Sequence, residues 1–126
     1  MITGVGTDVV DIDRFRDLED REAFLAHVFT HTEICNAPDG SAQEAFFATL
    51  FAIKEALLKA LGCGLESVSV WRDIQITPDW QPRLSGRPGR LAREKSVSKI
   101  HVSHSHSGKS AVAFVVMETA NREEVE

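Results

Sequence analysis

The sequence predicts an α+β domain in which an antiparallel sheet packs on one long buried helix. A nearly all-apolar segment of helical length, residues 41–61, lies in the middle of the chain. Segments that alternate apolar and polar residues lie on both sides of it. A short turn at Gly108-Lys109 separates the last two of these segments, which makes them antiparallel neighbours.

The first third of the chain predicts one strand followed by short helices. Ile2–Asp13 is rich in Ile, Val and Thr and reads as a strand, with glycines at positions 4 and 6 where another backbone or a ligand can come close. Arg14–Val28 spaces apolar residues among charges, as a helix or helix pair does. Thr30 and Glu33 have the spacing of a capping box at the start of the next helix.

The central helix is expected from Ser41 to Leu61. Ser41 is placed to cap its first turn with Glu44 as the capping-box partner, and Gly62 supplies the stop. The apolar residues lie nearly all round this helix, so it is expected to be buried.

The second half of the chain predicts strands separated by an irregular stretch. The residues between Pro82 and Lys99 are rich in Pro, Gly, Arg and Ser, and we expect a loop there with one short helix near Leu91. The tail from Asn121 is expected to fray. Strands are expected over Val68–Thr77, Ile100–Ser107 and Ser110–Glu118.

Composition limits the class of protein. The chain has 126 residues, 43% of them apolar and 26% charged, so we expect a single globular domain over 1–126. It contains no apolar run of about 20 residues and no basic segment followed by an apolar run at its start, so the expectation is a cytoplasmic protein without a membrane span. A net charge of −5 argues against nucleic acid as the main partner.

Three charges interrupt the apolar helix: Lys54, Glu55 and Lys59. Burying charge without partners costs several kcal/mol, so each needs a partner or a cleft. Glu55 and Lys59 are four residues apart and share a face. They form either an ion pair on a solvated strip or a carboxylate and an ammonium facing a cleft that holds a metal and a phosphate.

Asp8 is unusual because aspartate is depleted in strands. It is either an aspartate at a strand edge or end, or one ligand of a metal site. The second interpretation requires Asp8 and Glu55 to meet in space. Two carboxylates together with phosphate oxygens and water form the ligand set that suits Mg²⁺.

The segment from His101 to Ser107 alternates histidine and serine. In a regular strand His104 and His106 share one face and the serines lie on the other, an arrangement suited to phosphate. A zinc hydrolase site built on His101, His104 and His106 is the competing interpretation, although His101 points away from the other two. Gly62-Cys63-Gly64 either ends the helix or lets backbone amides approach a pyrophosphate.

Four separated motifs together resemble the holo-[acyl-carrier-protein] synthases, the small 4′-phosphopantetheinyl transferases. The most specific is the helix signature, Phe-Ala-x-Lys-Glu-Ala followed by Lys-Ala and Gly-x-Gly, which corresponds to residues 51–64. The others are the opening strand at Gly4–Ile12, the middle strand at Trp71–Ile76 and the closing hairpin from Ile100. The resemblance covers nearly the whole chain and implies the fold of that family.

The resemblance also implies a reaction. Phosphopantetheine would pass from coenzyme A to a serine of an apo acyl carrier protein, and adenosine 3′,5′-bisphosphate would leave. Asp8 and Glu55 would bind Mg²⁺, Glu55 would help remove the serine proton, and Lys59 would neutralise the phosphates. Contacts to coenzyme A are implied for Lys54, Lys59, Gly62, Gly64, Ser105 and His106.

The resemblance further implies a homotrimer with active sites between subunits, in which Arg14 and Arg21 face the carrier protein. Three positions depart from the family pattern. Leu50 stands where an arginine is frequent, Cys63 replaces a threonine or serine, and Gln81 begins a Gln-Pro-Arg where Gly-Lys-Pro is typical. The departure at Leu50 keeps open an alternative, a binding module that has the fold without the activity.

Overall fold

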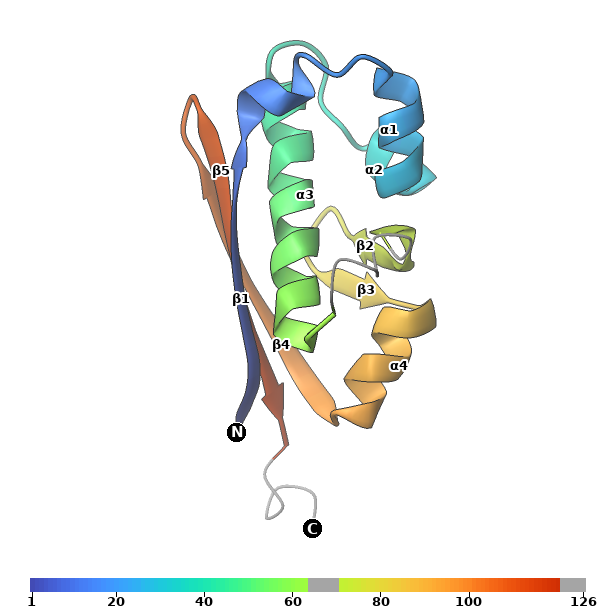
Figure 1. The fold of residues 1–126 in the computed structure, drawn as a ribbon, viewed down its shortest axis with the longest axis vertical. Helices are drawn as coiled ribbons and strands as arrows, with labels where there is room; N and C mark the ends of the chain where they lie inside the picture. Colours follow the sequence, from blue (N-terminus) through green and yellow to red (C-terminus); the bar gives the residue numbers. More distant parts are fainter. Residues whose placement is uncertain (64–70, 121–126) are drawn as a thin grey trace.

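The computed structural model describes residues 1–63 and 71–120. A three-stranded antiparallel sheet in the order β1-β5-β4 carries the long helix α3 on one face, and β2 and β3 form a separate two-stranded ribbon (Figure 1). The elements are β1 Ile2–Asp11, the 3-10 helix η1 Ile12–Phe15, α1 Arg21–Val28, α2 His31–Cys35, α3 Ala42–Leu61, β2 Ile74–Ile76, β3 Pro82–Leu84, α4 Gly86–Glu94, β4 Val97–His106 and β5 Ser110–Thr119.

Two glycines bring α3 close to β1. A Cβ atom on Gly4 would lie 2.1 Å from the carbonyl oxygen of Ala60, and one on Gly6 would lie 1.8 Å from that of Ala56. No side chain fits in such a gap, so the bare backbone lets the helix lie directly on the strand. This confirms the prediction that another backbone approaches at these positions, and it places the next inward-facing residue, Asp8, beside the middle of α3.

The buried faces of the sheet and of α3 form the core. Every residue of α3 from Phe47 to Lys54 is buried, as the apolar pattern predicts. Gly62 ends the helix with φ +79°, the left-handed conformation expected of a stop glycine. The capping box at Thr30 and Glu33 is also confirmed, since each side chain accepts a hydrogen bond from the other residue's backbone amide.

The predicted capping box of the long helix is wrong. Ser41 precedes α3 but has helical backbone angles, φ −66° and ψ −17°, and its side chain makes no capping hydrogen bond. A capping side chain normally extends from a non-helical residue. Here the amide of Gln43 is satisfied by the carbonyl oxygen of Gly40 instead.

The middle of the chain differs most from the expectation. The strand predicted over Val68–Thr77 is limited to Ile74–Ile76 among the described residues, because Trp71–Asp73 form a 3-10 turn and residues 68–70 lie outside them. The loop expected from Pro82 contains β3, which pairs with β2, and α4 covers the position of the short helix near Leu91. Pro82 is the first residue of β3, where its missing amide is tolerated.

The remaining boundaries move by two or three residues. β1 ends at Asp11 and passes into η1, and β4 begins at Val97. The hairpin at Gly108-Lys109 is confirmed, with β4 and β5 antiparallel on either side. In the described part of the chain no helix is long and apolar enough to cross a membrane. The tail from Asn121 lies outside the described residues.

Candidate active site

Asp8 and Glu55 meet between β1 and α3. Asp8 points inward from the strand and its side chain is only 10% exposed. The negative charge of Asp8 acts on the carboxyl group of Glu55. The two residues therefore lie near each other within one chain, as the metal prediction requires.

The surroundings of Glu55 favour its protonated form. Burial raises the pKa of Glu55 above its usual value, and the nearby Asp8 carboxylate raises the pKa further. The cations Lys59 and Arg14 oppose that shift. Two close carboxylates therefore share a half-buried position with two positive side chains.

Lys59 lies on the open side of this pair. Its Nζ donates to Asp8 Oδ1 at 3.1 Å and to the carbonyl oxygen of Thr7 at 3.0 Å, while 55% of its side chain is exposed. The guanidinium of Arg14 lies 5.5 Å from the ring centroid of Phe51. An ion pair between Glu55 and Lys59 was one of two alternatives, and Lys59 instead pairs with Asp8.

One oxygen of the pair has no hydrogen-bond partner among the described residues. It is Asp8 Oδ2, which is buried. A buried carboxylate oxygen without a partner is costly, and a cation beside it removes that cost. No group of three or more His, Cys, Asp or Glu side chains around a metal position occurs among the described residues. Asp8 and Glu55 thus fit an ion such as Mg²⁺, which takes most of its ligands from water and substrate phosphates.

Lys54 does not reach this site, contrary to the expectation that it contacts coenzyme A. Its ammonium is fully buried and donates to Glu33 Oε1 at 2.7 Å and to the carbonyl oxygens of Val28 at 2.8 Å and Trp71 at 3.2 Å. These three bonds use all three of its hydrogens. Burial lowers the pKa of Lys54 and the Glu33 carboxylate opposes that shift, so the residue next to Glu55 ties α3 to the core.

The glycines after α3 contribute less than expected. The amide of Gly62 donates to the carbonyl oxygens of Leu58 and Lys59, so it is used by the helix end and is not free for a pyrophosphate. Gly64, the second predicted contact, lies outside the described residues.

The histidines of β4 lie on the other outer strand of the sheet. His104 and His106 line a cavity of about 270 Å³ together with Phe46, Thr49 and Trp80. Burial lowers the pKa of His104, and the neighbouring His106 adds to the effect. Because the sheet order is β1-β5-β4, this cavity is separated from Asp8 by the width of the sheet.

The zinc interpretation is wrong within the described residues, where no cluster of metal-binding side chains exists. His101 pairs with Val116 across the sheet and its Nε2 lies 3.4 Å from Glu118 Oε2, on the face opposite His104. Ser105 is also exposed on that outer face, as the alternation predicts. Ser105 and His106 therefore cannot contact one phosphate from the same side of a single chain.

Arg21 makes contacts within its own chain. Its guanidinium donates to the carbonyl oxygen of Phe15 at 2.7 Å and to Gln43 Oε1, and it lies 5.9 Å from the ring centroid of Phe47. These contacts hold η1 against the start of α3. Arg21 therefore has a structural role, and its docking role stays a prediction, while Arg14 lies near Glu55.

The three positions that depart from the family pattern lie in different parts of the structure. Leu50 is 2% exposed and belongs to the core. The amide of Cys63 donates to Leu58 O at the helix end, and the amide of Gln81 donates to Thr77 Oγ1 in the loop between β2 and β3.

Sequence reasoning missed Trp80. Its ring lies 4.2 Å from that of His104 and 6.0 Å from that of Phe46, between centroids. The only sequence signal was a large aromatic residue after Pro-Asp in an otherwise turn-like stretch.

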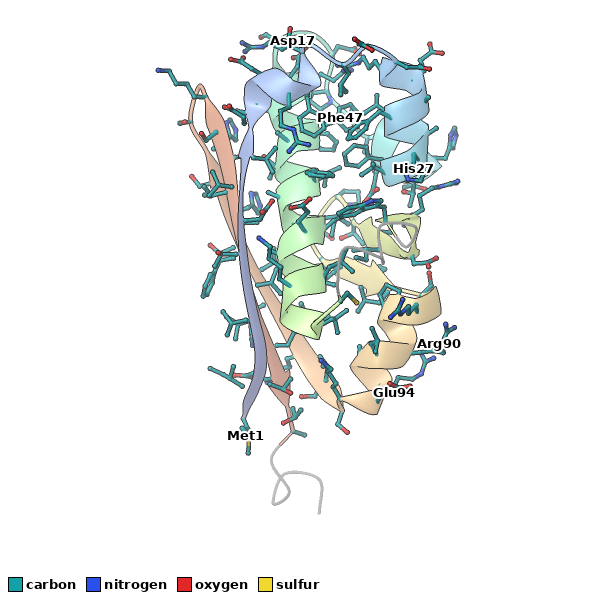
Figure 2. The ribbon with its side chains drawn as sticks, viewed as in Figure 1. Met1, Asp17, His27, Phe47, Arg90 and Glu94 are labelled. Atoms are coloured by element: carbon teal, nitrogen blue, oxygen red, sulfur yellow. The ribbon has the colours of Figure 1, made fainter. Side chains whose placement is uncertain are left out.

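Figure 2 shows how densely the side chains fill the space between α3 and the elements around it, where Phe47 is labelled.

Comparison with known proteins gives one consistent result. Residues 4–116 match the model of the 4′-phosphopantetheinyl transferase superfamily. The chain is 43% identical over 126 residues to the holo-[acyl-carrier-protein] synthase of Geotalea daltonii, covering 94% of this chain and 99% of that protein.

Solved structures agree with this match. The holo-[acyl-carrier-protein] synthase of Neisseria meningitidis superimposes with a TM-score of 0.78 at 32% identity, covering 94% of this chain and all of that one. The synthase of Bacillus anthracis, solved in complex with CoA (3′,5′-ADP), gives a TM-score of 0.74 at 31% identity, covering 95% of this chain and 99% of that one.

Proposed function

The chain belongs to the holo-[acyl-carrier-protein] synthases of the 4′-phosphopantetheinyl transferase superfamily, and from this we propose that it transfers 4′-phosphopantetheine from coenzyme A to a serine of an apo acyl carrier protein with the help of Mg²⁺. The serine oxygen bonds to the β-phosphorus of coenzyme A while the bond from that phosphorus to the bridging oxygen breaks. Adenosine 3′,5′-bisphosphate leaves. The observation that carries the proposal is the meeting of Asp8 and Glu55 beside an unpartnered carboxylate oxygen.

Asp8 and Glu55 hold the ion in this proposal. Mg²⁺, when bound, supplies positive charge to the pyrophosphate oxygens, which stabilises the charge that develops on them. Glu55 accepts the proton of the serine hydroxyl. Without a metal the surroundings raise the pKa of Glu55, whereas a bound Mg²⁺ would favour its carboxylate, the form that can accept a proton. Lys59 is exposed and can leave Asp8 to neutralise a phosphate.

Mass spectrometry of a carrier protein tests the proposal. The intact mass of an apo carrier incubated with this protein, coenzyme A and Mg²⁺ should rise by one phosphopantetheine. Asp8→Asn and Glu55→Gln should each lower turnover by about 10²-fold or more, whereas Asp11→Asn, an exposed carboxylate on the same strand, should leave it unchanged. Full activity in either site variant would refute the metal assignment.

Binding measurements separate the ion from the chemistry. Calorimetry should detect Mg²⁺ binding that is lost in Asp8→Asn, and a chelator should stop transfer reversibly. If coenzyme A binds but none of several carriers gains mass, the alternative function of a binding module without chemistry is favoured.

We also propose a homotrimer whose active sites lie between subunits. No described element covers the sheet face opposite α3, and this face is apolar, with Val5, Val9, Val112 and Phe114 between 40% and 67% exposed. Burying such a patch against a copy of the chain is favourable. The position of His106 on β4, far across the sheet from Asp8 on β1, supports a site completed by a second subunit.

A further inference from the structure

Trp80 has a backbone conformation that its residue type disfavours. Its φ is +62°, in the left-handed region where a bulky side chain is a genuine outlier. It lies in the tight loop between β2 and β3, where its amide donates to the carbonyl oxygen of Thr77 at 2.8 Å and the amide of Thr77 donates to that of Gln81 at 2.9 Å. A glycine would adopt this conformation without cost. The large ring is therefore retained against a local preference, which suggests that it has a use.

The ring is held in one place by aromatic neighbours. It stacks on His104 of β4 with 4.2 Å between ring centroids and an interplanar angle of 38°. Phe46 of α3 lies 6.0 Å away at 58°. These contacts come from two elements outside its own loop, so they lock the orientation of the indole. Trp80 nevertheless remains only half-buried, so part of its surface is open.

Two cavities meet at this ring. Phe46 and Trp80 line both a cavity of about 180 Å³, shared with Leu50 and Ile76, and the cavity of about 270 Å³ that contains His104 and His106. The combination is a rigid aromatic surface, apolar walls and an exposed imidazole at the edge. Such a combination suits a flat heteroaromatic ring that carries phosphate, because the ring stacks and the phosphate meets the imidazole.

We propose that Trp80 is the stacking surface for the nucleotide base of coenzyme A and thereby determines which donors the enzyme accepts. This inference rests on the proposed function, in which coenzyme A is the donor and contains one such base. Stacking is present equally in the ground state and in the transition state. Its loss therefore raises KM for coenzyme A while kcat at saturation stays the same.

The first test is binding of the leaving group. Adenosine 3′,5′-bisphosphate has the base, whereas inorganic pyrophosphate does not. Trp80→Gly, which keeps the backbone conformation available, should weaken binding of the bisphosphate about 10-fold or more in calorimetry and leave pyrophosphate binding with Mg²⁺ unchanged. Trp80→Phe should restore most of the affinity. Trp80→Leu should not, because it fills space without an aromatic face.

A fluorescence measurement covers the case in which Trp80→Gly does not fold. The chain has two tryptophans, so Trp71→Phe leaves Trp80 as the sole emitter. Saturating adenosine 3′,5′-bisphosphate should quench its emission, and pyrophosphate should not. Equal emission with and without the bisphosphate would overturn the inference, as would unchanged bisphosphate affinity in folded Trp80→Leu.

These outcomes are distinct from failure of the proposed function. If the wild type transfers phosphopantetheine but the Trp80 variants keep its KM for coenzyme A, only the inference fails and the ring is a packing residue. If the wild type shows base-dependent binding and no carrier gains mass, the inference stands and the proposed reaction fails. Weaker binding of both ligands in Trp80→Leu would indicate a disturbed cavity and would also overturn base recognition.

Discussion

Replacing Lys54 tests the part of the structure that sequence reasoning misread. Lys54→Met keeps most of the apolar stem and removes the ammonium, which leaves the Glu33 carboxylate buried without its cation. It also leaves the carbonyl oxygens of Val28 and Trp71 without this donor. Removing one partner of a buried ion pair typically costs about 3–5 kcal/mol. That is a large share of the roughly 5–15 kcal/mol by which domains are stable.

The expected shift in melting temperature follows from chain length. Unfolding entropy is about 2.1 cal/mol/K per residue, so the 126 residues of this chain give about 0.26 kcal/mol/K. A loss of about 3–5 kcal/mol therefore corresponds to a fall of roughly 11–19 °C. Thermal unfolding followed by circular dichroism, at fixed protein concentration, measures it. Lys109→Ala, an exposed cation in the hairpin, is the control and should shift the midpoint little.

A double-mutant cycle separates the ion pair from the loss of packing. Glu33 also accepts hydrogen bonds from the amides of Thr30 and Ile76, which glutamine can only partly replace. Lys54→Met with Glu33→Gln should cost less than the sum of the two single changes, by about 1–3 kcal/mol. Additive effects, or a cost of Lys54→Met below about 1 kcal/mol, would refute the reasoning. A raised KM for coenzyme A in folded Lys54→Met would restore its predicted role in binding.

Three further changes test other parts of the structure. Gly6→Ala places a Cβ 1.8 Å from the carbonyl oxygen of Ala56. It should lower the free energy of unfolding in urea by about 1–3 kcal/mol or more, and it should reduce transfer because it moves α3 away from Asp8. Gly108→Ala is the control, because a Cβ there meets nothing within 4 Å. The pKa of His104 is lowered by burial, so the unfolded chain takes up this proton first and the free energy of unfolding should fall as pH drops below about 6.5. In His104→Asn the free energy of unfolding in urea should differ less between about pH 7.5 and 5.5 than in the wild type. An unchanged difference would contradict the pKa shift. Phe114→Glu puts a charge on the sheet face opposite α3, where the side chain is 44% exposed. It should convert the proposed homotrimer to monomer in light scattering and reduce transfer, and an unchanged molar mass would count against this face as the interface.

The central helix shows how far sequence reasoning reached. Its length, its burial and its glycine stop all follow from local pattern, since the apolar residues lie round the whole helix and Gly62 adopts the conformation that it favours. The same pattern marked three charges as needing partners. It could not assign those partners, because Glu33 is 21 residues from Lys54 and Asp8 is 51 residues from Lys59.

The candidate site was predictable in part for the same reason. Asp8 and Glu55 were predicted as site residues because an aspartate is unusual in a strand and a glutamate is unusual in an apolar helix. The resemblance to the synthases implied that both bind one metal ion. Lys54 was misread because the residue type of a cation carries no information on whether the fold already uses its hydrogens. Trp80 was missed because its importance lies in a loop conformation and in contacts to β4 and α3.

The elements with a local signal were predictable from the amino acids alone: the helix with its stop, the capping box at Thr30, the closing hairpin and the α+β class. Which charge faces inward, which glycine lies against a neighbouring backbone and which histidine lines a cavity became known from the folded arrangement. The physical reason is that burial and hydrogen bonding depend on distances between residues far apart in the chain. Neighbours such as Lys54 and Glu55 differ by about 100° around a helix, and that rotation places one ammonium in the core and one carboxylate beside Asp8.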